Sequence, residues 1–554
     1  MSALFHPYLC GRIAAEWLIN MSESGKKQTF LHGAALLAIA TAVVKVIGAL
    51  YKIPLKMVIG DAGYGYFMTA YNIYSVLLMI STAGLPVAMS RMVSQASSLG
   101  HYNQVRQVYR TARGIFLGLG VVSSLLMLVF CHQLAAFQRQ PDAWAAIAIL
   151  GPCALLMGII STYRGFFQGQ GNMRPTSISQ VVEAIFKLLV GLAAALVVKR
   201  LTNDDALAAA GAILGVTVSC LISAVYLKSK HSPAYKDLPQ TGESVSSWGA
   251  TAKGLLVIAV PITIGSAGLQ LLTVLETNLY MGQLLTANGL SQSTADQIKG
   301  IYDMSQTIFN MPCAFIIPIT VSIIPAITAQ LTLKNDSAVR ATEESAARIT
   351  GLIALPCAVG LGVLARPVMA LLGDYSGDKL DLAAQLMIIL SVGIFLYAIV
   401  QYTNAVMQAH GYAHIPVVNM LLAGVAKLAA VYILTGNPAI GIRGTAIGAT
   451  GCYLCIAVLN LISIRKFVPQ KPALLKNLLR PFIPAAVMGG AVYGVYHLLT
   501  AVLGADGSRI LLCGIPIAAG VAVYAVLIVV LKSITKEDCQ LLPKGDKLAK
   551  LLRL

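Results

Sequence analysis

Charged residues are scarce in this chain. Only 11% of its 554 residues are Asp, Glu, Lys or Arg, whereas 57% are apolar, and the mean hydropathy is +0.76. Soluble domains carry roughly 25% charged residues. A chain with so little charge cannot cover a compact core with hydrated surface, so the composition predicts an all-α protein that crosses a membrane many times.

Motifs for enzymatic chemistry are also missing. The chain has no G-x-x-x-x-G-K-[ST] loop for ATP, no D-x-D carboxylate pair for a metal-bound sugar nucleotide, and no large outside segment. Cys452 and Cys455 form a C-x-x-C, but it lacks the second pair or the His cluster that a zinc site needs. The sequence therefore predicts a protein that is not an enzyme and binds no cofactor or metal.

Basic residues are in excess, and the net charge is +18. No compact basic domain is present that would bind nucleic acid, so we expect no nucleic-acid partner. If the N-terminus lies inside, the inside segments carry 27 Lys and Arg and the outside segments carry 8. This asymmetry predicts a multi-pass protein of the cytoplasmic membrane with both termini in the cytoplasm.

Fourteen apolar segments are long enough to cross a bilayer, which takes about 20 residues. They lie at about 30–57, 64–91, 111–134, 143–167, 176–198, 206–227, 252–281, 298–329, 346–371, 382–408, 415–435, 441–464, 478–501 and 508–531. Residues 1–29 are expected to form a cytoplasmic tail. Because Met21 opens a polar, basic leader (MSESGKKQTF), we expect it to be the true start, or residues 1–20 to be dispensable.

An internal repeat divides these segments into two units. The stretch YRGFFQGQGNMRPTSISQVVEAIFK (163–187) has a relative in QAHGYAHIPVVNMLLAGVAK (408–427), and Arg113 matches Arg348. In both stretches a Gln is followed by Gly at +3, by Pro at +7 or +8, and by Lys at +19. Six spans per unit is an even number, so both units insert with the same orientation, as in parallel transporter repeats.

The repeat predicts the domain organisation. The expected parts are an N-lobe of six helices (30–228), a cytoplasmic linker (229–250), a C-lobe of six helices (251–465), two further helices (477–532) and a basic cytoplasmic tail (533–554).

Lysines in the first span are candidate functional residues, because a charge at mid-bilayer costs about 2.5–3.5 kcal/mol on insertion scales. Lys45 and Lys52 are seven residues apart and share one helix face. They are expected to line a polar cavity or, alternatively, to form a structural pair with an acidic residue of another span. Lys56 lies near the outer end and is expected to extend towards the membrane surface.

The fifth span carries Glu183 and Lys187 at i, i+4, with the acidic residue first, which favours an ion pair within the helix. Such a pair is either a neutral unit that lets the helix insert into the membrane, or a pair that opens when an anion competes for Lys187. Arg91 and Arg164 lie at inside ends of spans. They are either topology anchors or groups that capture an incoming phosphate with a planar guanidinium.

The second unit contributes two further candidates. Lys427 has no carboxylate in its own span, which makes it a candidate anion-binding residue. Glu276 has no cation in its own helix. It is expected to pair with Lys45 or Lys52 across the lobes, or to bind a coupling cation.

Several of these stretches resemble a known family. VVKVIGALYKIPL, GYGYFMTAYNIYSVLLMISTAGLPVAMSRMVSQ and YRGFFQGQGNMRPTSISQVVEAIFKL are similar to the stage V sporulation protein B family. That family lies in the polysaccharide-export and flippase branch of the MATE-like superfamily, with MurJ-type lipid II flippases as relatives. The resemblance implies a V-shaped pair of six-helix lobes around a cationic cavity, with Lys45, Lys52 and Arg91 near the expected cavity positions.

The resemblance also implies a function and partners. The cargo would be an undecaprenyl-pyrophosphate-linked sugar precursor for peptidoglycan, spore cortex or another polysaccharide. The partners would be this precursor, membrane lipids and cell-wall synthesis enzymes, and the chain would be a monomer. In-span cations outnumber in-span anions, which suits this anionic cargo; a cation-coupled multidrug exporter of the MATE type is the alternative.

Overall fold

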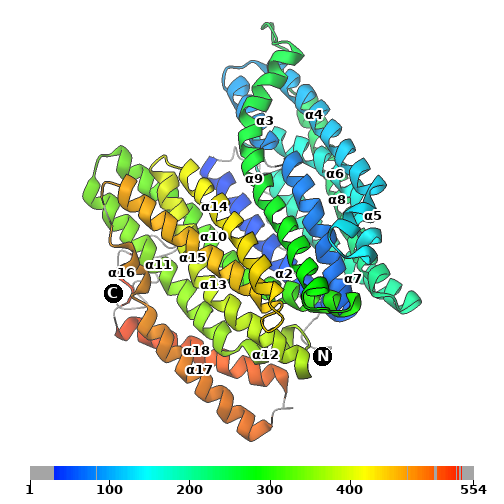
Figure 1. The fold of residues 1–554 in the computed structure, drawn as a ribbon. Helices are drawn as coiled ribbons and strands as arrows, with labels where there is room; N and C mark the ends of the chain where they lie inside the picture. The colour runs from blue at the N-terminus through cyan, green and yellow to red at the C-terminus, as the bar shows by residue number, and fades with distance from the viewer. Residues whose placement is uncertain are drawn as a thin grey trace.

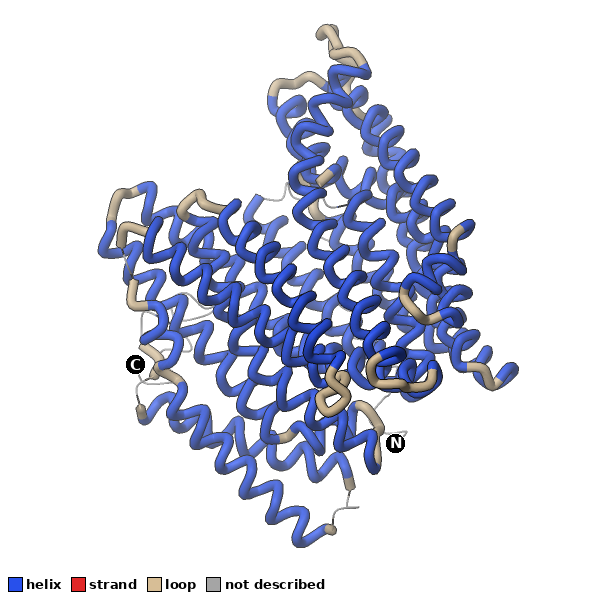
Figure 2. The backbone as a smooth tube through the Cα atoms, viewed as in Figure 1, coloured by secondary structure: helices blue, strands red, loops and turns tan. Residues whose placement is uncertain are grey.

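The computed structural model describes residues 30–82, 84–470, 472–504, 508–531, 533–535 and 538. Most of the expected tails, including Met21, lies outside the described residues. All regular structure in the described ranges is helical (Figure 2). The prediction of an all-α protein is therefore confirmed.

Eight helical elements make up the first half of the chain. They are α2 (Phe30–Thr82), α3 (Leu85–Ser98), α4 (Tyr102–Val129), α5 (Cys131–Phe137), the short 3-10 helix η1 (Pro141–Ala143), α6 (Trp144–Gly169), α7 (Arg174–Thr202) and α8 (Asp205–Lys236).

The second half contains ten more helices. They are α9 (Trp248–Thr286), α10 (Gln292–Thr332), α11 (Asp336–Val363), α12 (Ala365–Leu372), α13 (Gly377–Ala409), α14 (His414–Gly436), α15 (Arg443–Phe467), α16 (Leu474–Leu479), α17 (Phe482–Leu503) and α18 (Arg509–Val530).

The helix α2 is interrupted at Gly60, which has φ 73° and ψ −176°. Only glycine adopts this backbone region readily, so the chain bends here between two helical segments. In the described part of the chain, 12 helical stretches are long and apolar enough to cross a membrane, and one of them (Val43–Ser98) runs through this bend. The chain is a multi-pass membrane protein, but the predicted number of fourteen spans is not confirmed.

The helices form two groups (Figure 1). Helices α2 to α8 make up the first group and α10 to α15 the second, while α9 packs against α2 and α3 as well as against α14. The groups lie close together at the bottom of the view and diverge towards the top, which gives the V shape expected of a MATE-like fold. The last two helices, α17 and α18, pack on α11 and α12, away from the first group.

Polar contacts tie the two groups together at one end, near Asp61. Lys379 Nζ lies 2.7 Å from Asp61 Oδ2. Tyr66 donates a hydrogen bond of 2.9 Å to Asp296 Oδ2, and the hydroxyls of Tyr64 and Thr307 share one of 2.6 Å. We call this region the closed end, because side chains from both groups contact one another there.

Candidate functional site

A group of charged side chains lies where the two helix groups meet. We call it the interface cluster. Its members come from α2, α7, α9, α10 and α14, and each is buried or half-buried. They are Lys52, Lys187, Glu276, Lys299, Asp303 and Lys427.

The most deeply buried pair of the cluster is Lys299 and Asp303 on α10. The Nζ of Lys299 lies 2.5 Å from Asp303 Oδ2 and donates a second hydrogen bond of 3.0 Å to the Gly65 carbonyl on α2. Lys299 is fully buried. A buried charge of this kind is tolerated only when it is paired and hydrogen-bonded.

Sequence reasoning missed this pair. Neither Lys299 nor Asp303 is among the candidate residues that the sequence analysis names. The signal was present, because the two residues are spaced i, i+4 in IKGIYDM at the start of the predicted span 298–329. Lys299 lies inside α10, and its partner Asp303 is on the same helix.

The second pair of the cluster joins α9 to α14. Lys427 Nζ lies 2.5 Å from Glu276 Oε2, and Glu276 is only 6% exposed. The prediction that Glu276 pairs with Lys45 or Lys52 is therefore wrong. The reason is tertiary: α9 packs alongside α14, which brings the carboxylate to a lysine 151 positions away in the chain.

Lys52 and Lys187 supply the remaining charges. Asp303 attracts Lys52 and Lys187 repels it, so these three groups lie within electrostatic range of one another. Lys187 also lies 5.9 Å from the centroid of the Tyr71 ring. Within the described ranges neither lysine forms an ion pair, so the cluster holds four lysines and only two carboxylates. Its net positive charge is suited to binding an anion.

Glu183 has a different partner from the one expected. Its Oε2 pairs with Arg164 Nη2 at 3.0 Å, and Arg164 Nε donates a second hydrogen bond of 3.0 Å to Ser179 Oγ. The expectation of an ion pair with Lys187 is wrong because α6 and α7 form a hairpin that places Arg164 beside Glu183. Arg164 is thus already bound to a carboxylate, and Lys187 is left facing Tyr71.

Two predicted site residues lie apart from the cluster. Lys45 on α2 and Arg91 on α3 are both exposed, and neither forms an ion pair with another described residue. The expectation that Lys56 extends to the membrane surface is wrong. It is 6% exposed, hydrogen-bonds the Gly373 carbonyl and lies 3.1 Å from Asp61 Oδ1 at the closed end.

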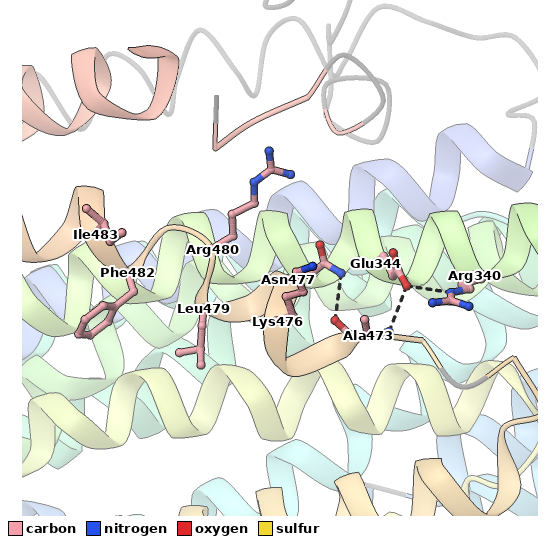
Figure 3. Close-up of a pocket in the computed structure, with 9 residues that line it drawn as sticks. All are labelled: Arg340, Glu344, Ala473, Lys476, Asn477, Leu479, Arg480, Phe482 and Ile483. Atoms are coloured by element: carbon pink, nitrogen blue, oxygen red, sulfur yellow. Dashed lines mark hydrogen bonds and ion pairs between the residues drawn. The ribbon is translucent and has the colours of Figure 1, made fainter. Parts of the chain in front are cut away.

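A hollow lies away from the interface cluster, between α11 and α16 (Figure 3). Its volume is about 980 Å³, and its lining includes Arg340, Glu344, Lys476 and Arg480. Glu344 binds both Arg340 Nε and the Ala473 amide at 3.0 Å. Figure 3 shows Glu344 between Arg340 and Ala473, with both contacts drawn as dashed lines.

Metal ligands are not gathered anywhere in the described ranges. No group of three or more His, Cys, Asp or Glu side chains is placed there so that it could hold an ion.

Residues 30–330 match the family of polysaccharide biosynthesis proteins. The chain belongs to this family. It is 26% identical to stage V sporulation protein B of Bacillus subtilis (strain 168), over 93% of this chain and 98% of that protein. It is 24% identical to the lipid II flippase MurJ of the same organism, over 83% of this chain and 87% of that protein.

Solved structures share the fold of this family member. A lipid II flippase MurJ in an inward closed conformation superposes with a TM-score of 0.65 at 13% identity, over 90% of this chain and 98% of that one. An inward-facing multidrug resistance MATE transporter of the MOP superfamily gives 0.60 at 15% identity, over 78% and 99%. The MATE-like fold is confirmed, and the activities named for these proteins are transport rather than catalysis.

Proposed function

We propose that this chain is a transporter that moves an undecaprenyl-pyrophosphate-linked sugar precursor across the cytoplasmic membrane by alternating access. The observation that carries the proposal is the excess of lysine in the interface cluster, where Lys52 and Lys187 have no ion-pair partner among the described residues. A pyrophosphate head is anionic and its sugars are polar, whereas its lipid tail stays in the bilayer. Transport of such a cargo requires a positive, polar contact between helix groups that open in turn.

The relatives support this assignment. Among them is a lipid II flippase that the chain matches over 87% of its length. In the proposed cycle the pyrophosphate is held by Lys52 and Lys187, while Lys299 and Lys427 remain bound to their own carboxylates. The closed end then separates, and the head group leaves on the other side.

The orientation and partners belong to the same proposal. Both termini are placed in the cytoplasm because of the charge asymmetry of the loops. The chain acts as a monomer beside cell-wall synthesis enzymes that make and use the precursor. The positions of the lysines do not distinguish precursors of peptidoglycan, spore cortex and other polysaccharides. The sugar is assigned by depleting the protein and identifying the lipid-linked intermediate that accumulates.

A cation-coupled multidrug exporter is the second candidate, since the MATE transporter shares the fold. Such an exporter needs a carboxylate for its cationic cargo or coupling ion. Glu276 is one of the two buried carboxylates of the interface cluster, but one of its oxygens is held by Lys427. Drug resistance on expression, lost in Glu276→Gln, would favour this candidate over the flippase.

Proteoliposomes provide the direct test. The purified chain is reconstituted with a fluorescent undecaprenyl-pyrophosphate sugar, and movement between leaflets is measured with a membrane-impermeant quencher. We expect Lys52→Gln and Lys187→Gln each to slow movement by about tenfold, because each removes one charge-assisted contact to phosphate. Lys466→Gln, at an exposed lysine of α15, is the matched control. Equal rates in all four proteins would contradict the proposal.

A further inference from the structure

A second basic site lies on the outer face of the first helix group, away from the interface cluster. It is a cavity of about 640 Å³ between α4 and α8, at the end of the molecule where the linker joins α8 to α9. Four cationic side chains line it, and no lining residue is acidic: Arg110, Arg113, Lys228 and Lys236. Each of them is exposed, and none forms an ion pair with another described residue.

The floor of this cavity is an aromatic box around His231. The rings of Tyr109 and Tyr235 stack on the imidazole at centroid distances of 4.5 and 5.2 Å, and Tyr163 lies 4.9 Å away. His231 is only 6% exposed, and its Nε2 has no hydrogen-bond partner. A buried polar atom without a partner is costly, so a ligand that reaches this floor gains a contact that the protein itself does not satisfy.

An apolar groove continues the cavity along the helices. A second hollow of about 240 Å³ shares Tyr109, Arg113, Leu117, Tyr163 and Lys228 with the first. Its remaining wall is mostly aliphatic, with Leu156, Ile159, Leu221 and Val225. Leu221 and Val225 are 51% and 61% exposed on the outside of α8. The whole site thus has a cationic head region and an apolar track that faces the hydrocarbon.

The other lobe shows that this cationic region is not required by the fold. Arg348 occupies the position in the second repeat that matches Arg113 in the first. Arg348 is 8% exposed and is bound by Asp538, with Nη2 to Oδ1 at 2.8 Å. One copy of the repeat therefore neutralises its arginine within the protein, whereas the other presents it, with three further cations, at a cavity.

From this arrangement we propose that the cavity binds the phosphate head of an anionic glycerophospholipid, with one acyl chain in the groove between α4, α6 and α8. The chemistry is a phosphodiester held by Arg113 and Lys228 at the boundary between head groups and hydrocarbon. The linker end is the one expected to face the cytoplasm, where the leaflet carries anionic lipids. The site is separate from the cargo path and does not depend on the proposed function.

Lipid titration of the full purified chain tests the site. Dioleoyl phosphatidylglycerol or dioleoyl phosphatidylcholine is added in a neutral detergent, and the bound lipid is counted by native mass spectrometry. We expect preferential binding of phosphatidylglycerol. Arg113→Gln and Lys228→Gln should each weaken it by about fivefold, the effect of roughly one unit charge at a membrane surface. Lys253→Gln, at an exposed lysine near the start of α9, is the control and should bind as the unchanged chain does.

Two further measurements distinguish binding of a lipid from binding of a free phosphate. Val225→Trp fills the groove from an exposed position, and it should weaken binding of the lipid without affecting the head region. Glycerol 1-phosphate carries the phosphate without acyl chains, and it should compete poorly. Equal binding of both lipids, equal binding by Lys253→Gln and the two pocket variants, or full competition by glycerol 1-phosphate would overturn the proposal. If one pocket variant does not fold, the other and Val225→Trp still decide it.

Discussion

The charge of Glu276 is balanced by the charge of Lys427, so the two residues are considered as one ion pair. The 6% exposure of Glu276 and its 2.5 Å contact with Lys427 make the two residues one neutral unit. Moving two such charges out of water costs free energy. Their mutual attraction offsets that cost only while both charges are present. The net positive charge of the interface cluster therefore comes from the lysines that remain after the pairs are formed.

The first prediction concerns this pair. Glu276→Gln leaves the ammonium of Lys427 without its counter-charge in a partly buried position, so we expect a loss of about 3 kcal/mol in the free energy of unfolding. The double variant Glu276→Gln/Lys427→Gln removes both charges and should recover most of that loss. Thermal unfolding in detergent, followed by circular dichroism, measures both. A double variant no more stable than the single one would contradict the pairing.

At the scale of elements, the linker between α8 and α9 is held by the first turn of α4. Glu243 Oε1 accepts hydrogen bonds from the amides of Asn103 and Gln104, at 2.7 and 3.1 Å. A carboxylate at a helix N-terminus satisfies amides that have no partner within the helix. The hydrogen bond from the Thr241 side chain, together with backbone amides, lowers the pKa of Glu243 from 4.5 to about 2.

The second prediction is a pH dependence of this contact. Because the folded pKa is below the unfolded one, the stabilisation is complete above about pH 4.5 and is lost as the pH falls towards 2. We expect pepsin to cut the linker faster as the pH falls through this window, after correction with an unstructured reference peptide. Glu243→Gln should remove the pH dependence, whereas Asp237→Asn, at an exposed carboxylate of the same segment, should retain it.

Another contact between elements joins α11 to the segment after α18. Asp538 is fully buried and accepts from Arg348, from Ser345 and from the Thr535 amide. Arg348 also donates to Asn477 of α16 at 3.0 Å. Three separate parts of the chain therefore depend on one buried guanidinium.

The third prediction follows from this dependence. Asp538→Asn leaves Arg348 buried without a counter-charge, and we expect a loss of roughly 3–5 kcal/mol and a lower Tm. Replacing both residues, as in Arg348→Met/Asp538→Leu, should be much less harmful. Arg340→Gln, at an exposed arginine of the same helix, serves as the control. An unchanged Tm in Asp538→Asn would show that the segment after α18 is not held by this contact.

At the scale of the whole molecule, the closed end depends on a close approach of backbones. A Cβ placed on Gly300 of α10 would lie 1.8 Å from the Asp61 carbonyl oxygen, which belongs to the other helix group. Such a separation is far inside van der Waals contact, and the obstacle is backbone that cannot rotate away. The closed arrangement therefore requires a residue without a side chain at this position.

The fourth prediction uses this requirement. Gly300→Ala should disfavour the arrangement that is closed at Asp61 and shift the population towards one in which the groups separate there. Pulsed electron spin resonance between labels at exposed Leu201 and Ser293, in a background without other cysteines, measures the separation. Gly490→Ala, where nothing lies within 4 Å of the added Cβ, is the control. Identical distance distributions in both variants would contradict a role for Gly300 in closure.

The sequence alone determined the class and general plan of this protein. Low charge, long apolar segments and the repeat at 163–187 and 408–427 predicted a helical membrane protein related to flippases. These properties follow from hydrophobicity and local spacing, which do not depend on how the helices pack. The ionisable residues within spans were identifiable for the same reason, with Asp303 overlooked although its spacing to Lys299 was visible.

Only the tertiary structure decided how the charges are paired. Glu183 is closest to Lys187 in the sequence but binds Arg164, and Glu276 binds Lys427 from a distant helix. In a membrane, a buried charge takes whichever counter-charge the packing brings within reach, and that depends on helix rotation and crossing. Local spacing carries no information about either. For this reason the candidate residues could be identified from the sequence, whereas the finding that Lys52 and Lys187 form no ion pair with another described residue could not.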